Sequence, residues 1–513
     1  MRFNLSSLFF IILILSFLVR LERLDFPLSD IFWWGDGTKD FLVANHILKY
    51  GEYPLVGPYN LLYENGVRNS PLYFYTLALL LMPFNHPITL TFFNICFQIA
   101  VLVLIYFIAR KIFNSSIALS AMALYSFSSG VIKQSDYVWQ PYLMQPIALL
   151  SLYFLIKAYV DKNYDLSRSY KFFIASEVTF CLAAAFHLSV LAWFPIFLIT
   201  GIIILRGRPL KYFLGSFAVI SVSILLLYAP TISFQVFNNL SSPLIVNSIG
   251  QYFNNLTLNL TEVFNMLNIN FPHFFVFIAL SIAAIVFGII RNKWFILTII
   301  MFFVPVIFAS FINKIRPNYL ILSLGPFIIW VTVLTGLTLQ KLGRIFVFLL
   351  LFIIFSGNLN FFRETNPLGN LRYIEKITDK ISVELNSIKK GNNLKSFNFF
   401  RVQSFAFENG VLDYQNKFFE YPVLDSMLLV SLEDKLKQKL TEVSDKSPSN
   451  LIQINKGNYI FVSCYIFNLN GRKISCRDEF VAKSAEYNFL KTVYLDKNVE
   501  IYLYVRGNDS QRE

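Results

Sequence analysis

Charged residues are scarce in this sequence: Asp, Glu, Lys and Arg make up 15% of its 513 residues, whereas 56% are hydrophobic. This shortage of charge excludes an ordinary soluble protein and indicates a chain that crosses a membrane several times. The net charge of +13 would suit a nucleic-acid-binding protein, but within residues 1–357 most Lys and Arg residues lie in short gaps between apolar runs. Basic residues in such gaps set the orientation of a membrane protein, so no nucleic acid is expected as a partner.

Cysteine is also rare, with four in the whole chain, which excludes a disulfide-stabilised scaffold. Cys96 and Cys181 fall inside apolar runs and are expected to be core residues. Cys464 and Cys476 lie in the polar C-terminal region. They can form a disulfide if that region faces an oxidising compartment, although two unpaired buried thiols fit the sequence about as well.

The first apolar run lacks the small-residue cleavage site that a removed signal peptide carries. The run extends from Leu5 to Val19, follows the short basic start Met1-Arg2 and is itself followed by Arg20. We therefore expect a retained membrane anchor at the start of the chain.

Eleven apolar runs are candidates for spans of a bilayer, which need about 20 residues each. The predicted spans are 5–19, 89–109, 117–132, 141–157, 171–187, 188–205, 212–230, 274–290, 294–312, 318–336 and 343–357. The further run 71–83 has only thirteen residues and is bounded by prolines. We expect it to form a short helix next to the membrane, because it is too short to cross.

The distribution of basic residues indicates how these spans are oriented. Gaps on the side of the N-terminus hold thirteen Lys and Arg residues, whereas the opposite gaps hold only Lys133, Lys314 and Arg316. This bias predicts a multi-pass plasma-membrane protein with a cytoplasmic N-terminus. Counting 71–83 as a span would reverse every later gap and put most of the basic charge outside.

The composition changes near residue 358, where charges become frequent and apolar runs shorten. Residues 1–357 are therefore expected to form a transmembrane domain with a first outer loop at 20–88, and residues 358–513 an extracytoplasmic α/β domain. Helical spacing over 371–388 predicts an amphipathic helix, and short or alternating apolar segments predict strands. These segments are 397–405, 458–467, 489–495 and 499–506.

A polar, acidic segment at 31–58 follows the first span, and carboxylates held close to a bilayer are natural candidates for chemistry. Asp36 or Thr38 is expected to cap a helix of about three turns that ends at Gly51 and lies in the membrane surface. Asp36 and Asp40 are four residues apart and share a face. The positive helix N-terminus favours an ionised Asp36, as a base or a cation ligand requires. The alternative is that Asp36 only caps the helix and that Asp40 is a solvated surface residue.

Three elements follow one another in this region: Asp36-x-x-x-Asp40, Gly51-x-x-Pro54-x-x-Gly57-Pro58 and Pro71-Leu72-Tyr73-Phe74-Tyr75. Together they resemble the first loop of the GT-C membrane glycosyltransferases, the superfamily of protein O-mannosyltransferases and lipid A aminoarabinose transferases. The closest resemblance is to a group of uncharacterised bacterial members. Further matches are Arg110-Lys111-Ile112-Phe113, Ser135 with Trp139-Gln140-Pro141, His187-Leu188-Ser189 and Arg316-Pro317-Asn318-Tyr319-Leu320.

This sequence departs from the pattern at three positions. Gly37 stands where many relatives have an acid, Gln140 replaces the Asn of a Trp-Asn-Pro element, and Asp136 stands where a basic residue is usual. A second acid in the site would therefore have to come from Asp40 or Asp136. A divalent cation held by Asp36 with one of these two acids is possible on charge grounds, but the ligands are few and scattered.

The resemblance implies an α-helical polytopic fold and transfer of a sugar from a polyprenyl phosphate or pyrophosphate carrier to a hydroxyl of a glycan, lipid or protein. Asp36 is then the general base, with Asp40 as the second catalytic candidate. Arg316, with Lys314 and Arg68 as further candidates, would bind phosphate, because a guanidinium matches phosphate geometry. The other expected substrate-binding residues are His187, Tyr319, Asp136, Trp139 and Tyr73. The alternative for the cations and aromatic residues is a structural role at the membrane surface.

Two rival classes remain. A flippase, polysaccharide exporter or lipid-binding scaffold would also have many spans, but it predicts ionisable residues forming a path through them. Here the ionisable groups lie mainly at the predicted outer edge, and Glu177 is one of few exceptions. A polysaccharide polymerase or ligase is expected to use a large outer loop with arginines, and the loop at 231–273 contains neither Arg nor Lys.

Overall fold

The structure is a computed structural model, and the residues that it describes form two compact units. They are 5–22, 24, 36–51, 53–55, 57, 69–128, 131–132, 134–135, 138–237, 279, 282, 293–310, 321–342, 376, 379–380, 383, 398–402, 441–443, 459–465, 487–495 and 499–506. Unit 1 comprises Met1–Pro27 and Asp40–Thr365, and unit 2 comprises Leu28–Lys39 and Asn366–Glu513.

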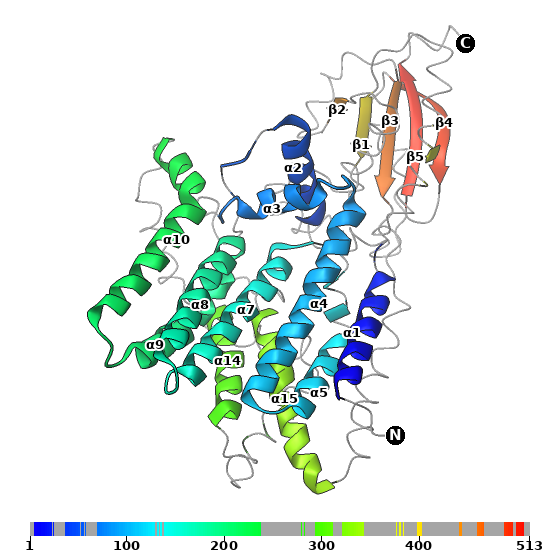
Figure 1. The fold of residues 1–513 in the computed structure, drawn as a ribbon. Helices are drawn as coiled ribbons and strands as arrows, with labels where there is room; N and C mark the ends of the chain where they lie inside the picture. The colour runs from blue at the N-terminus through cyan, green and yellow to red at the C-terminus, as the bar shows by residue number, and fades with distance from the viewer. Residues whose placement is uncertain are drawn as a thin grey trace. The chain divides into compact units, whose positions relative to one another are not determined.

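Unit 1 is helical throughout its described part (Figure 1). Its elements are α1 (Leu5–Leu21), α2 (Asp36–Tyr50) from Asp40 onward, α3 (Leu72–Leu81), α4 (Pro87–Ile112), α5 (Ser115–Ser126), α7 (Gln140–Asp161), α8 (Leu166–Phe186), the 3-10 helix η2 (Leu188–Trp193), α9 (Phe194–Leu205), α10 (Leu210–Phe237), α14 (Lys293–Ser310) and α15 (Ile321–Leu342). In the described part, five helices are long and apolar enough to cross a membrane: Pro87–Ile112, Gln140–Asp161, Leu166–Phe186, Leu188–Leu205 and Leu210–Ser233.

Most predicted spans correspond to a helix, and one of them is clearly shorter than expected. The short helix expected at 71–83 is confirmed as α3, whose ten residues extend only about 15 Å. The span expected at 117–132 is too long, because α5 ends at Ser126 after twelve residues. The predicted span 343–357, and all of 274–290 except residues 279 and 282, lie outside the described residues.

Helix α1 runs antiparallel to α4. Phe9 packs against Tyr106 at 4.7 Å between ring centroids, and Phe17 lies near Phe92 at 6.4 Å. The C-terminal end of α1 therefore lies beside the first turns of α4, which directly follow α3. We call this end of unit 1, where α3 and the start of α4 lie, the loop end. The opposite end, where α7 turns into α8, is the turn end.

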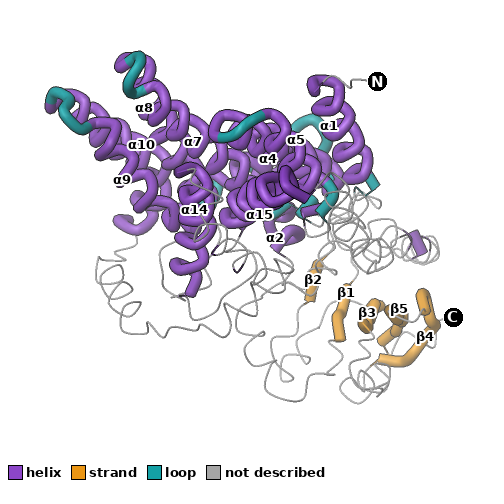
Figure 2. The backbone as a smooth tube through the Cα atoms, turned by 90° about the horizontal axis from the view of Figure 1, so that it is seen from below, coloured by secondary structure: helices purple, strands orange, loops and turns teal. Residues whose placement is uncertain are grey.

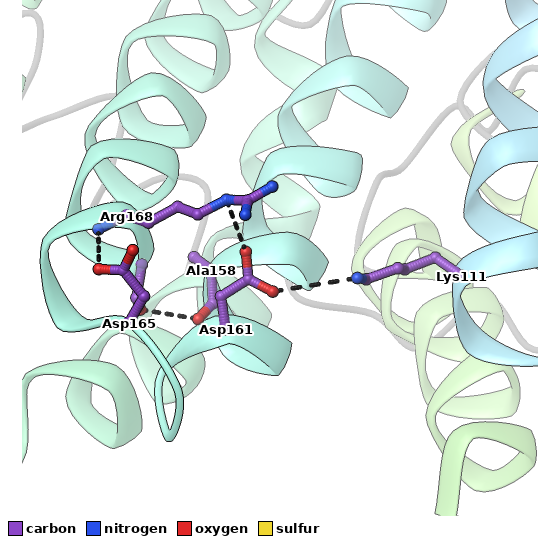
Figure 3. A network of polar contacts seen from close by, with 6 residues as sticks. Lys111, Ala158, Asp161, Asp165 and Arg168 are labelled. Carbon is purple, nitrogen blue, oxygen red and sulfur yellow. Dashed lines mark hydrogen bonds and ion pairs between the residues drawn. The ribbon is translucent and has the colours of Figure 1, made fainter.

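Helices α4, α7 and α8 pack side by side, and polar contacts fasten them at the turn end (Figure 3). Asp161 lies 3.9 Å from Nζ of Lys111 and 3.4 Å from Nε of Arg168. Asp165 caps α8, because its Oδ1 accepts a hydrogen bond of 2.9 Å from the backbone N–H of Arg168. These contacts close the α7–α8 hairpin.

Small polar residues join the helices deeper in the bundle. The hydroxyl of Ser151 donates to the carbonyl of Ser176 at 2.7 Å, and the hydroxyl of Ser176 donates to the carbonyl of Ser151 at 3.0 Å. Glu177, which is also buried, accepts a hydrogen bond from the hydroxyl of Ser216 on α10. Such contacts are typical of helices that pack inside a membrane, where burial of apolar surface does not drive association.

Unit 2 contains a five-stranded sheet in the order β2-β1-β3-β5-β4, drawn in orange in Figure 2. Its strands are β1 (Asn398–Val402), β2 (Thr441–Val443), β3 (Tyr459–Tyr465), β4 (Tyr487–Leu495) and β5 (Val499–Arg506). β1 pairs in parallel with β2 and β3, whereas β5 pairs antiparallel with β3 and β4. The four predicted strands are confirmed, and β2 was not predicted.

The other predictions for unit 2 concern residues that are largely undescribed. Of the amphipathic helix expected at 371–388, the structure describes Lys376, Asp379, Lys380 and Val383, all helical and exposed. Cys464 lies in β3, but Cys476 lies outside the described residues, so the disulfide between them stays a prediction.

Candidate active site

Helix α2 is fastened to the segment that follows it by two polar pairs, whose members on α2 are buried. Oδ2 of Asp40 accepts a hydrogen bond of 2.8 Å from the hydroxyl of Tyr73, and Oδ1 of Asn45 accepts one of 2.7 Å from the amide of Asn85. Asp40 is 2% exposed and Asn45 6%. The expectation that Asp40 is a solvated surface residue is therefore wrong. The apolar residues buried on the same helix are Phe41, Ala44 and Ile47.

Asp36 and Gly51 mark the two ends of α2. The helix begins at Asp36, whose backbone is described and whose side chain lies outside the described part. It continues for fifteen residues, slightly longer than expected, and the backbone N–H of Gly51 then bonds the carbonyl of Ile47 at 2.9 Å. Gly51 has φ +69°, so the predicted glycine stop is confirmed. Asp36 thus occupies the first turn, where the helix carries partial positive charge.

The turn after α2 packs directly on the chain that precedes α3. The N–H of Gly57 donates to the carbonyl of Asn69 at 2.9 Å, and a Cβ atom added to Gly57 would meet the carbonyl oxygen of Ser70 at 2.2 Å. The hydroxyl of Tyr75 donates to the carbonyl of Pro54 at 2.6 Å. The three elements that carry the family resemblance therefore lie together, because the Asp40–Tyr73 bond joins the first of them to the third.

Helix α10 ties this cluster to α8. The hydroxyl of Ser70 donates to the carbonyl of Leu227 at 2.6 Å, and the hydroxyl of Thr231 donates to the carbonyl of Leu55 at 3.3 Å. Between these two contacts on α10, the hydroxyl of Tyr228 donates to the carbonyl of Ala184 at 2.9 Å. The C-terminal end of α8 therefore lies at the loop end.

His187 stands at this end of α8 and joins it to η2. Its Nδ1 accepts a hydrogen bond of 3.2 Å from the backbone N–H of Ser189 and lies 2.8 Å from the hydroxyl of the same residue. Burial lowers the pKa of His187 to about 4, so the ring is neutral near pH 7. With Nδ1 as the acceptor of the backbone bond, Nε2 carries the proton and is a hydrogen-bond donor.

The start of α7 also lies at the loop end. Trp139 precedes the first residue of this helix, and Oε1 of Gln140 accepts a hydrogen bond of 3.3 Å from the amide of Asn69. The residues just before it are held by α4, since the amide of Asn94 donates to the carbonyl of Gln134 at 2.7 Å. The Trp-Gln-Pro element is thus beside the Pro-Leu-Tyr element, as one site would require.

A chain of hydrogen bonds links four helices beneath these loops. The hydroxyl of Tyr125 lies 3.2 Å from Oε1 of Gln145 and 3.4 Å from Oε1 of Gln98, and Nε2 of Gln145 donates to the carbonyl of Ile321 at 3.4 Å. The Ile321 contact fixes the orientation of Gln145. The hydroxyl of Tyr125 therefore donates towards two amide oxygens, of which that of Gln145 is the nearer.

Several predicted site residues lie outside the described residues. These are Arg68, Asp136, Lys314, Arg316 and Tyr319, so their roles stay predictions. Within the described part of the chain, no three His, Cys, Asp or Glu side chains come together as a metal site would require. The cation site expected at Asp36 with Asp40 or Asp136 stays a prediction, because the side chains of Asp36 and Asp136 lie outside the described residues.

Sequence reasoning missed part of the buried polar set at the loop end, including Asn69, Tyr125, Gln98 and Arg20. For two of these residues, Gln98 and Arg20, the sequence did contain a signal. Gln98 interrupts the apolar run 89–109, and Arg20 directly ends the first one. Polar residues at such positions are costly and usually have a specific partner.

No protein-family model matches the sequence, and no curated protein matches it. Among solved structures, ArnT from Cupriavidus metallidurans bound to undecaprenyl phosphate matches with a TM-score of 0.61 at 12% identity, covering 97% of this chain and 98% of that chain. The apo state of ArnT matches with a TM-score of 0.56 at 11% identity and the same coverage. The chain has the GT-C fold.

The match confirms the predicted fold class over nearly the full length of both chains. The GT-C fold accounts for a helical unit 1 that carries its polar loops at one end. At 12% identity the likeness concerns the fold, so the chemistry has to be argued from the residues of this chain.

Proposed function

We propose that this chain is a membrane glycosyltransferase that transfers a sugar from a polyprenyl-phosphate carrier to an acceptor hydroxyl at the extracytoplasmic face. The observation that carries the proposal is the fold match, over 97% of the chain, to ArnT bound to undecaprenyl phosphate. The packing of all three motif elements at the loop end supports it. The isoprenoid tail of such a donor partitions into lipid, which suits a site at the end of membrane helices.

The reaction that we propose is a single displacement with inversion. Asp36 takes the proton from the acceptor hydroxyl, whose oxygen forms a bond to the anomeric carbon while the bond from that carbon to the phosphate oxygen breaks. The departing phosphate leaves with the electron pair of that bond. The position of Asp36 in the first turn of α2 favours its ionised form, which a base requires.

In this mechanism Asp40 positions α2 rather than taking the proton. Its Oδ2 is bonded to Tyr73, and it is almost fully buried, so the pair holds the helix that begins with Asp36. If the reaction uses a second acid, Asp136 is then the candidate. Arg316, with Lys314 and Arg68, remains the proposed cation set for the phosphate, and Tyr319 and Trp139 remain proposed substrate-binding residues.

The test is a transfer assay with purified full-length protein in nanodiscs and labelled polyprenyl-phosphate sugars. General-base catalysis contributes about 10² to 10⁴ in rate, so Asp36→Asn should lose label transfer by a factor in that range. Asp165→Asn at the turn end is the matched control, because asparagine also caps helices well. Transfer by a normally folded Asp36→Asn protein at the wild-type rate would overturn the role of Asp36.

A further inference from the structure

Arg20 is a fully buried cation in unit 1, with 0% of its side chain exposed. It is the second-last residue of α1, and its guanidinium reaches across to the C-terminal end of α5. Nη1 donates to the carbonyl of Ser126 at 3.0 Å, to the carbonyl of Ser16 at 3.1 Å and to the hydroxyl of Ser16. One nitrogen of the guanidinium therefore fastens α1 to α5.

The two other nitrogens of Arg20, Nε and Nη2, are buried and have no hydrogen-bond partner in the part of the chain that the structure describes. They share one edge of the planar group, and their N–H bonds point in parallel. This is the edge with which arginine binds a carboxylate or a phosphate through two hydrogen bonds. Among the described residues, no carboxylate forms an ion pair with Arg20.

The charge of Arg20 is only partly compensated by its surroundings. The C-terminal ends of α1 and α5 each present partial negative charge, and Arg20 lies at both. These partial charges help to explain how Arg20 is accommodated in the interior, but two unmade charge-assisted hydrogen bonds remain costly when they are buried. An oxyanion on the free edge would supply both bonds.

Arg20 lies at the loop end. The antiparallel register of α1 and α4, set by the pairs Phe9–Tyr106 and Phe17–Phe92, places it beside the first turns of α4. The carbonyl that it contacts belongs to Ser126, next to Tyr125 in the hydrogen-bond chain beneath the motif loops. The free edge is thus on the side of the bundle where the proposed donor binds.

We propose that the Nε–Nη2 edge of Arg20 binds a phosphate oxyanion, supplied by the head group of the lipid-linked donor. The choice of the lipid as the source rests on the proposed function, whereas the oxyanion class follows from the free edge itself. Arg20 then belongs to the substrate-binding set together with the cations proposed from sequence. Its Nη1 keeps the guanidinium in place while the other edge holds the ligand.

Binding of undecaprenyl phosphate to full-length protein in nanodiscs of neutral lipid tests this proposal, with Arg20→Lys as the main variant. Lysine keeps the charge but cannot form two parallel hydrogen bonds to one phosphate, so we expect the affinity for undecaprenyl phosphate to fall about 10- to 100-fold. The uncharged alcohol undecaprenol should bind weakly to the wild type. Asp165→Asn at the turn end is the matched control: it lies at the opposite end of unit 1 and asparagine also caps helices well, so its affinity should stay within about twofold of wild type.

Competition with inorganic phosphate identifies the source of the oxyanion. If millimolar phosphate does not displace the lipid, the lipid head group is the ligand. If it displaces the lipid, the site is a general phosphate site and the lipid assignment is overturned. Unchanged affinity in Arg20→Lys, or equal binding of undecaprenol, overturns the whole proposal. A folded protein that binds the lipid through Arg20 but transfers no sugar contradicts the proposed function alone.

A second measurement uses the wild-type protein and does not depend on the folding of a variant. A polyprenyl phosphate with a photoreactive group next to the phosphate should form adducts in peptides from the end of α1 and the end of α5. Adducts confined to other segments would show that the head group binds elsewhere and would overturn the assignment to Arg20.

Discussion

The hydroxyl of Tyr73 on α3 donates a hydrogen bond of 2.8 Å to Oδ2 of Asp40 on α2, and both side chains are buried. This bond spans 33 residues of sequence and joins the helix that begins with Asp36 to the body of unit 1. The placement of the proposed base therefore depends on a pair of residues that does not itself take the proton.

Removing the hydroxyl of Tyr73 should weaken both stability and transfer. Tyr73→Phe leaves a buried carboxylate oxygen without this donor, which costs about 1 to 3 kcal/mol. Thermal unfolding in detergent measures the loss, and the transfer assay should show a lower turnover. Tyr53→Phe, at an exposed tyrosine, is the control and should leave the melting temperature unchanged. Equal melting temperatures for both variants would remove the structural role of the bond.

Gly57 should tolerate no side chain. In Gly57→Ala the new Cβ would meet backbone carbonyl oxygens at 2.2 and 2.6 Å, and backbone cannot move aside as a flexible side chain can. Gly51→Ala is the comparison, because nothing lies within 4 Å there and only the positive φ is unfavourable, at about 1 to 2 kcal/mol. We expect the larger fall in melting temperature for Gly57→Ala. The reverse order would show that the two turns are not packed as described.

The turn end should be stabilised more by the cap of α8 than by its ion pairs. Asp165→Ala removes the acceptor for the N–H of Arg168 and should cost about 1 kcal/mol. Arg168→Ala removes an exposed ion pair with Asp161 and should cost less. Chemical unfolding at low and high salt separates the two contributions, since only the ion pair is screened. A larger, salt-sensitive loss for Arg168→Ala would contradict this ranking.

His187 should make unit 1 less stable in acid. Its pKa in the folded state is about 4, below the value of about 6.5 in an unfolded chain. As pH falls from 6.5 towards 4, the unfolded chain takes up a proton that the folded protein does not, so stability decreases over that range. His187→Asn keeps a side-chain acceptor for the N–H of Ser189 but does not titrate. Its melting temperature should fall less between pH 7 and pH 4.5 than that of the wild type, and parallel profiles would argue against a buried neutral ring.

The sequence predicted the extent of a helix well where a glycine or a proline marks one of its ends. Gly51 marks the end of α2, and the two prolines around 71–83 mark a run too short to cross a bilayer. The run 117–132 was assigned one long span, although serines at 126, 128 and 129 and Gly130 break it. The helix ends at the first of these serines, because such residues favour helix ends and turns.

Contacts between distant residues could not be predicted in the same way. The alternative that Asp40 is a solvated surface residue followed from its place on α2 alone, yet its partner Tyr73 comes from a later segment. Periodicity shows which residues share a face and does not show what covers that face. Strand β2 was missed for a similar reason, since it has three residues and exists by pairing with β1, where Asn398 lies opposite Thr441.

The hydroxyl of Tyr125 lies within hydrogen-bonding distance of two buried amide oxygens, those of Gln98 and Gln145, and the amide nitrogen of Gln145 reaches the carbonyl of Ile321. Apolar helix faces can slide past one another at little cost, but these polar contacts form in one register only. Shifting α4, α5, α7 or α15 alone would break at least one of these buried hydrogen bonds. The layer beneath the motif loops is thereby made stiff, which suits the proposed alignment of a sugar, a phosphate and an incoming hydroxyl.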